Sequence, residues 1–366
     1  RRQRQMCIRD SLKASTAKAL TEDGSLISAN TLITDTKGTL TNQGTLKGNT
    51  IITKSKNIMN KGTIFGNDLS LKASQDILQS GIIEGEDRIS LDAGRNITMK
   101  NTIQHGMNQT ILDTTAGIAV KGQEGVLLMQ AGQDITMTGA TLAALGKNGS
   151  MIFSAGHNLT MDTDSLEAKK DMTENSDNYI RTYRKTETAN TLTAGKDISL
   201  ISGNDLKARN TTVASETGAI TAKAGHDVTI ENGYNEAIDD YGLKYKESGF
   251  LSHKTTTIKS HDENKTATGS MLSGDTVTIV SGSNTKVIAS NVVGTNDVSI
   301  ASGKDTTIES AEEVEQHDYE KRVKKSGLLG GGLGFTIGSE KRNDQYKDAN
   351  ITQKGSTVGS IAGNVT

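Results

Sequence analysis

Two pairs of adjacent carboxylates, Asp239–Asp240 and Glu312–Glu313, are the side chains best suited to acid–base chemistry. Hydrolysis of a glycosidic bond needs two carboxyl groups at a set separation across that bond. Adjacent residues of a strand point to opposite faces of a sheet, so neither pair converges on one substrate. The chain also has no tryptophan to stack on a sugar ring. We therefore interpret both pairs as solvated surface charges and expect no catalytic residue.

Metal and phosphate chemistry find equally little support. The six histidines include no close pair at the spacing of metal ligands: His105, His157, His226, His253, His261 and His317. His157 and His226 occupy the variable position of a repeated turn and are expected to face solvent. The glycine run Gly330–Gly334 lacks the lysine and Ser/Thr that complete a P-loop, so we interpret it as a flexible hairpin or hinge. No metal and no cofactor are expected.

Tyrosine and basic side chains gather in segments that interrupt the regular pattern of the chain. Tyrosine is an effective contact residue because it offers area and a polar tip at low entropic cost. A basic cluster beside Tyr319 suits an anionic surface. The candidate contact surface therefore comprises Tyr179, Tyr183, Tyr241, Tyr245, Lys321, Arg322, Lys324 and Lys325. The alternative is that these segments only brace the rest of the fold.

The composition excludes several classes of protein. Only 33% of the 366 residues are hydrophobic and 3% aromatic, which is too few for a thick core. Proline is absent, whereas disordered chains are usually enriched in it. The 41 basic and 43 acidic residues nearly balance, so a nucleic-acid binder is not indicated. No apolar run is long enough for a transmembrane helix. The single cysteine, Cys7, excludes an internal disulfide framework.

One short phrase recurs along the chain: Gly-x-Asn/Asp followed by an aliphatic residue, Ser or Thr, and a second aliphatic residue. It begins at Gly66, Gly94, Gly132, Gly156, Gly195, Gly225 and, more loosely, Gly274. Apolar side chains at every second position, as in Ile135–Met137, predict a strand with one buried and one wet face. We expect the glycine to take a positive φ at a sharp corner. We expect the Asn or Asp to bond nearby backbone and close the turn rather than to bind calcium.

A related phrase ends in glycines at positions 48, 66 and 85, whose regular spacing indicates a structural repeat. Leucine-rich repeats need a different consensus, and propeller blades need about twice this length. Stacked turns that share a narrow core also explain the low apolar content. We therefore predict an all-β fold: a right-handed parallel β-helix with roughly 20-residue turns, about 12–15 of them, and loop or hairpin excursions.

These residues also carry a family resemblance. Ala93–Met99, Ala131–Met137 and Ala194–Leu200 resemble repeats of filamentous haemagglutinins and contact-dependent growth-inhibition exoproteins of two-partner secretion. The cognate segments Lys244–Leu251 and Lys321–Leu329 resemble their haemagglutinin repeat. The resemblance implies a secreted or cell-surface filament exported through an outer-membrane β-barrel transporter. It would contact a target-cell or host-cell receptor or matrix, or carry a toxin toward it. A purely structural spacer and, less favoured, a polysaccharide-acting β-helix enzyme remain the alternatives.

The expected organisation follows from these patterns. The first ten residues resemble translated sequencing-adapter sequence, and the absence of an Asn-Pro secretion signature and of a Val-Glu-Asn-Asn boundary motif predicts an interior piece of a longer protein. We expect an artefact or disordered arm at 1–11, β-helix at 12–164, a first excursion at 165–190, β-helix at 191–232, a second excursion at 233–270, β-helix at 271–310, and a third excursion with a truncated repeat at 311–366.

Overall fold

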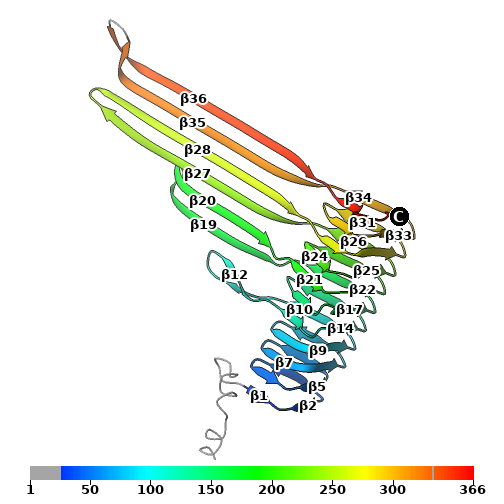
Figure 1. The fold of residues 1–366 in the computed structure, drawn as a ribbon. Helices are drawn as coiled ribbons and strands as arrows, with labels where there is room; N and C mark the ends of the chain where they lie inside the picture. Colours follow the sequence, from blue (N-terminus) through cyan, green and yellow to red (C-terminus); the bar gives the residue numbers. More distant parts are fainter. Residues whose placement is uncertain (1–25, 332–333) are drawn as a thin grey trace, which may run out of the picture.

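The computed structural model describes residues 26–331 and 334–366, so the suspected adapter segment and residues 11–25 lie outside the described residues. Every element in the described part is a β-strand, and none forms a helix that could span a membrane. Most strands stack in parallel into a rod, and a second group projects from it (Figure 1). The predicted parallel β-helix is confirmed.

Each turn of the rod contributes one strand to each of three parallel columns. The first column comprises β1 (Leu26–Ser28), β4 (Thr45–Lys47), β7 (Thr63–Ala73), β9 (Ile82–Ala93), β13 (Gly117–Val120), β16 (Thr141–Ala144), β21 (Asn190–Ala194), β24 (Thr211–Ser215), β29 (Met271–Gly274), β32 (Asn291–Gly294) and β37 (Thr357–Ser360). The second comprises β2 (Thr31–Asp35), β5 (Thr50–Ser55), the far halves of β7 and β9, β14 (Val126–Ala131), β17 (Ser150–Ala155), β22 (Ile198–Ser202), β25 (Ala219–Ala224), β30 (Thr276–Ser281) and β33 (Val298–Ser302).

The third column is a separate sheet of ten strands, one for each turn. It comprises β3 (Thr39–Asn42), β6 (Asn57–Asn60), β8 (Ile77–Gln79), β10 (Ile97–Lys100), β15 (Ile135–Thr138), β18 (Leu159–Asp162), β23 (Leu206–Arg209), β26 (Val228–Glu231), β31 (Thr285–Ile288) and β34 (Thr306–Glu309). The described residues thus form ten such turns, fewer than the roughly 12–15 that the sequence pattern indicated, in part because residues 102–114 leave the rod inside the β-helix expected at 12–164.

The core is a set of stacked side-chain columns. Ile97, Ile135 and Leu159 lie in register on β10, β15 and β18, and each side chain is fully buried. Thr136, between Ile135 and Met137, faces outward and is partly exposed. Period-two alternation therefore sets the inward and outward faces as expected.

The corner glycines serve a different purpose from the one expected. The positive-φ glycines of the described residues are Gly139 and Gly327, and neither begins the repeated phrase. Instead, a Cβ added at Gly156 would overlap the carbonyl oxygen of Gly132 one turn below, and Gly203 stands in the same relation to Gly156. Glycine is needed because the stacked corners approach too closely for a side chain, and the positive-φ interpretation is wrong.

At the corners that lead into the third-column strands β6 to β31, the Asn or Asp bonds to the next turn rather than closing its own. Its side-chain oxygen accepts the backbone N–H of the equivalent residue one turn further along. The phrases at Gly66 and Gly195 lead into the second column and lie outside this series. The pairs, acceptor first, are Asn57–Asp76, Asp76–Asn96, Asn96–Asp134, Asp134–Asn158, Asn158–Asp205, Asp205–Asp227 and Asp227–Asn284. Each bond contributes about 1 kcal/mol, so this corner ladder joins successive turns along one edge of the rod.

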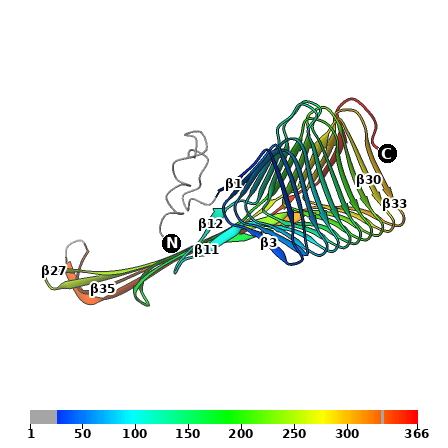
Figure 2. The same ribbon diagram turned by 90° about the horizontal axis from the view of Figure 1, so that it is seen from below.

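Within the described residues, 26–331 and 334–366, four β-hairpins interrupt the rod, and each leaves from the end of a third-column strand. They are β11 (Thr102–His105) with β12 (Thr110–Thr114), β19 (Ser165–Asn175) with β20 (Asn178–Glu187), β27 (Gly233–Gly249) with β28 (Ser252–Thr268), and β35 (Ala311–Gly331) with β36 (Gly334–Lys354). Figure 2 shows them leaving one corner of the rod as a thin blade. The glycine run at 330–334 lies at the β35–β36 tip and includes residues outside the described part.

The hairpins leave after β10, β18, β26 and β34, which is every second turn. Adjacent strands lie about 4.8 Å apart, so two turns advance the rod by about 9.6 Å. A two-stranded hairpin occupies the same width. Successive hairpins can therefore lie edge to edge without a gap, and β19, β20, β27, β28, β35 and β36 form one antiparallel sheet. We call this six-stranded sheet the blade.

Candidate functional site

The blade brings together the segments in which sequence analysis placed a contact surface. Strand β20 pairs with β27, and β28 pairs with β35, so each hairpin is joined to the next through backbone hydrogen bonds. The β11–β12 hairpin also touches its edge, because the Lys169 N–H donates to the Asn108 carbonyl over 2.7 Å. The excursions are thus parts of one structure rather than separate loops (Figure 1).

The strand register divides the eight predicted contact residues between the two faces of the blade. Residues directly opposite each other on antiparallel strands point to the same face. Following the pairs from β20 to β36 places Tyr241, Tyr245, Lys321 and Lys325 on one face, and Tyr179, Tyr183, Arg322 and Lys324 on the other. We call these the Tyr241 face and the Tyr179 face. No single surface contains the whole predicted set.

The Tyr241 face carries a row of aromatic and aliphatic side chains across the blade. The row runs from β19 to β36 through directly opposite residues: Met172, Ile180, Tyr241, Ser260, Tyr319 and Tyr346. Met172 is 56% exposed, Ile180 42%, Tyr241 36% and Tyr346 54%. Ser260 interrupts the row and Tyr319 is half-buried, but the exposed aromatic and aliphatic side chains gathered on this one face mark a surface suited to contact with another molecule.

The tyrosines of the Tyr179 face are instead engaged within the blade. Arg181 lies 4.6 Å from the centre of the Tyr179 ring, and Lys169 lies 5.2 Å from that of Tyr183. A Cβ added at Gly242 would overlap the Tyr179 ring, so this ring covers a glycine on the neighbouring strand. These tyrosines brace the sheet, which was the alternative interpretation of the excursions.

Charge is also distributed unequally toward the blade tip. On the Tyr241 face, Lys254 pairs with Glu247 at 2.7 Å and Lys325 with Glu340 at 3.6 Å. On the Tyr179 face at the same level, the side chains are Lys246, Thr255, Lys324 and Lys341, which lie opposite one another. The tip of the Tyr179 face therefore carries a net positive charge, whereas the Tyr241 face is locally neutral.

Ion pairs between hairpins hold the blade together. Arg184 on β20 binds both carboxylate oxygens of Asp239 on β27, at 2.8 and 2.6 Å. Lys244 on β27 reaches Asp177 at the β19–β20 turn over 2.7 Å, and this hydrogen bond lowers the pKa of the Asp177 carboxyl. These contacts fix the register between hairpins as well as their proximity.

The carboxylate pairs considered for acid–base chemistry do not converge. Asp239 points to the Tyr241 face and pairs with Arg184, while Asp240 points to the other face and bonds His261. Glu313 accepts the backbone N–H of Ala267 over 3.0 Å. These charges hold strands in place instead of standing free in loops.

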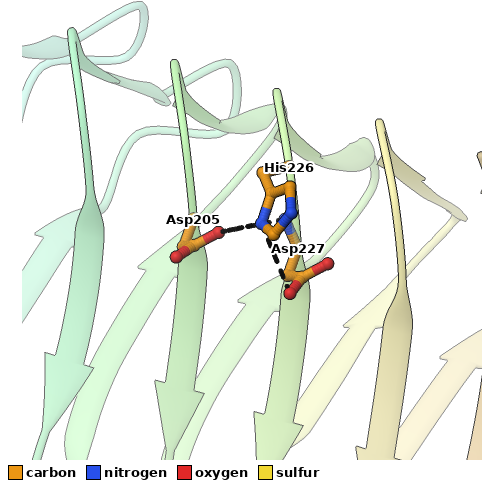
Figure 3. Close-up of side chains that lie close together, drawn as sticks. All are labelled: Asp205, His226 and Asp227. Carbon is orange, nitrogen blue, oxygen red and sulfur yellow. Dashed lines mark hydrogen bonds and ion pairs between the residues drawn. The ribbon is translucent and has the colours of Figure 1, made fainter.

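One group of potential metal ligands lies on the rod. Asp205, His226 and Asp227 have ligand atoms within 4.8 Å of one another, with His226 Nδ1 3.0 Å from Asp205 and 3.4 Å from Asp227 (Figure 3). Sequence reasoning did not connect them, although 205 and 226 lie one turn apart. The signal was the phrase Gly203–Leu206, a corner that the repeat analysis passed over.

The carboxylates of this group already have a structural task. Asp205 Oδ1 accepts the Asp227 N–H, and Asp227 Oδ1 accepts both the backbone and the side-chain N–H of Asn284. His157 lies over Asp134 in the same manner, 3.3 Å away, at a corner whose next residue is Asn158. The arrangement of Asp205, His226 and Asp227 is therefore part of the corner ladder. The side chains of His157 and His226, which lie beside this ladder, are more than half exposed.

Histidine–aspartate contacts in the blade predict a pH dependence. The hydrogen bond that protonated His261 donates from Nδ1 to Asp240 Oδ1, 2.5 Å away, raises the pKa of His261 above its usual value of about 6.5, and partial burial opposes this. Asp318, Glu263, Lys259, Lys347 and Arg181 surround this pair on the same face.

We expect the β27–β28 pairing to be more stable below about pH 6.5 than at pH 9, because a raised histidine pKa stabilises the fold only while the ring is protonated. The stability should be lost as the pH rises through the folded-state pKa of His261. Hydrogen exchange of β27 and β28 amides, corrected for intrinsic rates, measures this change. His261→Gln should remove it, and an unaltered pH dependence in that variant would contradict the assignment.

A parallel β-helix with hairpins every second turn defines a class of elongated repeat protein. Residues 251–366, which include β28, β35 and β36, match the family model described as Hemagglutinin repeat. Together with the relatives below, this match supports a likeness to the filamentous haemagglutinin and contact-dependent inhibition exoproteins, and residues 251–366 carry their hemagglutinin repeat.

Three curated relatives show the extent of the likeness. The chain is 34% identical over 183 residues to a deoxyribonuclease CdiA of Dickeya dadantii, which covers 49% of this chain and 6% of that protein. It is 32% identical over 162 residues to a tRNA nuclease CdiA of Escherichia coli, covering 43% and 5%. It is 28% identical over 209 residues to tRNA nuclease CdiA-2 of Burkholderia pseudomallei, covering 56% and 7%. The matches thus span a small fraction of each relative, and no solved structure matches.

Proposed function

We propose that this chain is a shaft segment of a secreted filamentous exoprotein, and that its blade contacts the surface of another cell. The rod supplies length and stiffness, because each turn is bonded to its neighbours along three strand columns and the corner ladder. The named nuclease activities of the relatives belong to proteins that these matches cover by 7% or less. We propose for this segment a non-enzymatic role in carrying or positioning such activities.

Export through an outer-membrane β-barrel transporter and residence at the bacterial surface are part of the same proposal. They are supported by the likeness to these exoproteins and by the architecture, since a rod built from successive turns can fold one turn at a time as it emerges. Contact with a target-cell or host-cell receptor or matrix is the step in which we expect the blade to act.

The observation that carries the proposal is the row of tyrosines on the Tyr241 face. Tyr241, Tyr319 and Tyr346 lie in line across three hairpin strands, and Tyr241 and Tyr346 are exposed while Tyr319 is half-buried, whereas the tyrosines Tyr179 and Tyr183 of the opposite face are packed against cations. A spacer needs no such row, because the strands of the blade are already joined by backbone bonds and by the Arg184–Asp239 and Lys244–Asp177 ion pairs.

Three triple variants test which surface is used. The first changes the row itself: Tyr241→Ser, Tyr319→Ser and Tyr346→Ser. The second changes the cations at the tip of the opposite face: Lys246→Ser, Lys324→Ser and Lys341→Ser. The third is a control on the exposed surface of the rod: Lys147→Ser, Lys223→Ser and Lys304→Ser.

We expect the tyrosine variant to lower attachment of the purified chain to bacterial or epithelial cells at least tenfold, because contact aromatics dominate interface energies. The rod control should be unchanged, and circular dichroism should show the parent strand content in all three. If only the second variant loses attachment, the contact surface is the Tyr179 face and not the Tyr241 face. No attachment by the parent chain would leave the structural spacer as the function.

A further inference from the structure

The last hairpin of the described residues, β35–β36, leaves one long strand edge unpaired. Strand β36 pairs with β35 on one side, and no other strand of the described residues lies along its second side. Its side chains from Ser339 to Gln353 are exposed except Asp344, whereas those of β28, between two neighbours, are mostly half-buried. The β36 edge therefore offers unpaired backbone groups, to which another strand can bond.

Strands β27 and β35 are copies of one another in sequence. Asp240–Tyr241 corresponds to Asp318–Tyr319, and Ser248–Gly249 to Ser326–Gly327. Lys246 and Lys324 correspond in the same alignment. The two strands therefore share the pattern Asp-Tyr, then a lysine, then Ser-Gly, with the same spacing in both.

Strand β28 binds one of these copies on each of its edges, and in the same register. Its Asp262 faces Asp239 on β27 and His317 on β35. Position 317 of β35 is equivalent to position 239 of β27 in the alignment of the two strands. Its Ser260 faces Tyr241 and Tyr319, which are also equivalent. The pairing between hairpins thus repeats the pairing within a hairpin.

Strand β36 occupies the same place in its hairpin as β28 does in the preceding one. It already pairs, on its inner edge, with β35, which is one of the two similar strands. On its inner edge Tyr346 faces Tyr319, and Asp348 faces His317, as Ser260 and Asp262 do on β28. The outer edge of β36 is therefore the equivalent of the β28 edge that binds β35. The spacing of the rod agrees, because a hairpin leaving two turns beyond β34 would arrive at this edge.

We propose that the outer edge of β36 binds the first strand of a further haemagglutinin-repeat hairpin, antiparallel and in the register that β35 has on the inner edge. Three opposite-charge pairs would then face each other across the new junction: Lys347 with Asp318, Asp344 with Lys321, and Glu340 with Lys325, where the second member of each is the incoming residue. Asp348 would face the incoming His317, which can donate a hydrogen bond to it. The like-charged pair Lys341–Lys324 is the exception.

The charged side chains of β36 also explain why its unpaired edge would bind a matching strand and not unrelated ones. Seven of its 21 residues are charged, which discourages pairing with unrelated strands. Opposite charges directly across a strand pair favour the pairing, and like charges disfavour it. An arriving strand is accepted only in the register that matches this pattern, so each hairpin acts as the template for the next.

A synthetic peptide with the sequence of residues 311–327, labelled with fluorescein, tests the proposal against the intact chain. The matched control is the same peptide with Asp318→Lys and Lys321→Asp, which keeps composition and net charge but places two like-charge pairs against Lys347 and Asp344. We expect saturable binding of the first peptide by fluorescence anisotropy, at a chain concentration shown to be monomeric by sedimentation. The swapped peptide should bind at least tenfold more weakly.

Hydrogen exchange locates the bound peptide. In an antiparallel pair the amides of alternate residues point to opposite edges, so every second amide of β36 should become at least tenfold slower to exchange when the peptide is bound. The unmodified chain is used throughout, so no variant can fail by misfolding. Absent binding, equal binding of both peptides, or protection that appears on β19 or on the rod instead would each overturn the proposal.

Discussion

Replacing Ile135 with aspartate should unfold the middle of the rod, with a loss of about 3–5 kcal/mol of stability. Ile135 is fully buried in a column between Ile97 and Leu159, so a carboxylate at this position would lie among apolar side chains. An unpaired charge in such a narrow core has no compensating partner.

The matched control is the neighbouring residue. Thr136 lies one position further along β15 and faces outward between Thr98 and Thr160, so Thr136→Asp should cost less than about 1 kcal/mol. Denaturant melts give the total change. Hydrogen exchange shows where it acts, and we expect faster exchange in β10, β15 and β18, because turns of a solenoid contact only their neighbours. Equal losses from both substitutions would show that the inward and outward faces are misassigned.

The rod was predictable from sequence because its information is local. Alternation such as Ile135–Met137 sets which side chains point inward, and the short, regular repeat leaves the stacked solenoid as the fold that buries them. The same repeat identified the corner glycines and the corner Asn or Asp residues, but it did not reveal what these residues do. Whether Asp134 bonds its own turn or the N–H of Asn158 depends on the vertical register between turns, and one phrase taken by itself does not contain that register.

The blade was not predictable from the same patterns. Its strands have mixed polar composition and no regular alternation, and their pairing joins residues as distant as Ile180 and Tyr241. Whether neighbouring hairpins can pair depends on the number of rod turns between them. This number is known only from the structure, where it is two. The split of the tyrosines between two faces follows only from this register, so the row through Tyr319 and Tyr346 was missed.

The candidate metal ligands Asp205, His226 and Asp227 were also missed because their proximity depends on the stacking of turns. Asp205 and His226 belong to different repeats of the sequence, yet they stack because each occupies the corner of its turn. In a solenoid, residues one period apart are spatial neighbours, so ligand spacing has to be examined at the repeat length as well as over shorter separations. Proximity alone does not make a site, however, since His157 and Asp134 show the same stacking in the ladder.

Substituting Gly156 with alanine should destabilise the rod by about 2 kcal/mol or more, although alanine ordinarily stabilises by restricting the unfolded chain. The added methyl group would overlap the carbonyl oxygen of Gly132, which is backbone and can yield only if the two turns separate. The control is Gly38→Ala, where the nearest atom to the new Cβ is 4.0 Å away, and this variant should be neutral or stabilised by up to about 1 kcal/mol.

A third variant separates close approach from backbone conformation as the reason for glycine at this corner. Asparagine tolerates positive φ better than most residues, so a positive-φ corner would accept Gly156→Asn more readily than Gly156→Ala. Close approach predicts the reverse order, because the larger side chain meets the same carbonyl and the bonded ladder beside it. Thermal or denaturant melts of the three variants measure the order. If Gly156→Asn is the more stable of the two corner variants, then the corner glycines are selected for their backbone angles and the stacking explanation fails.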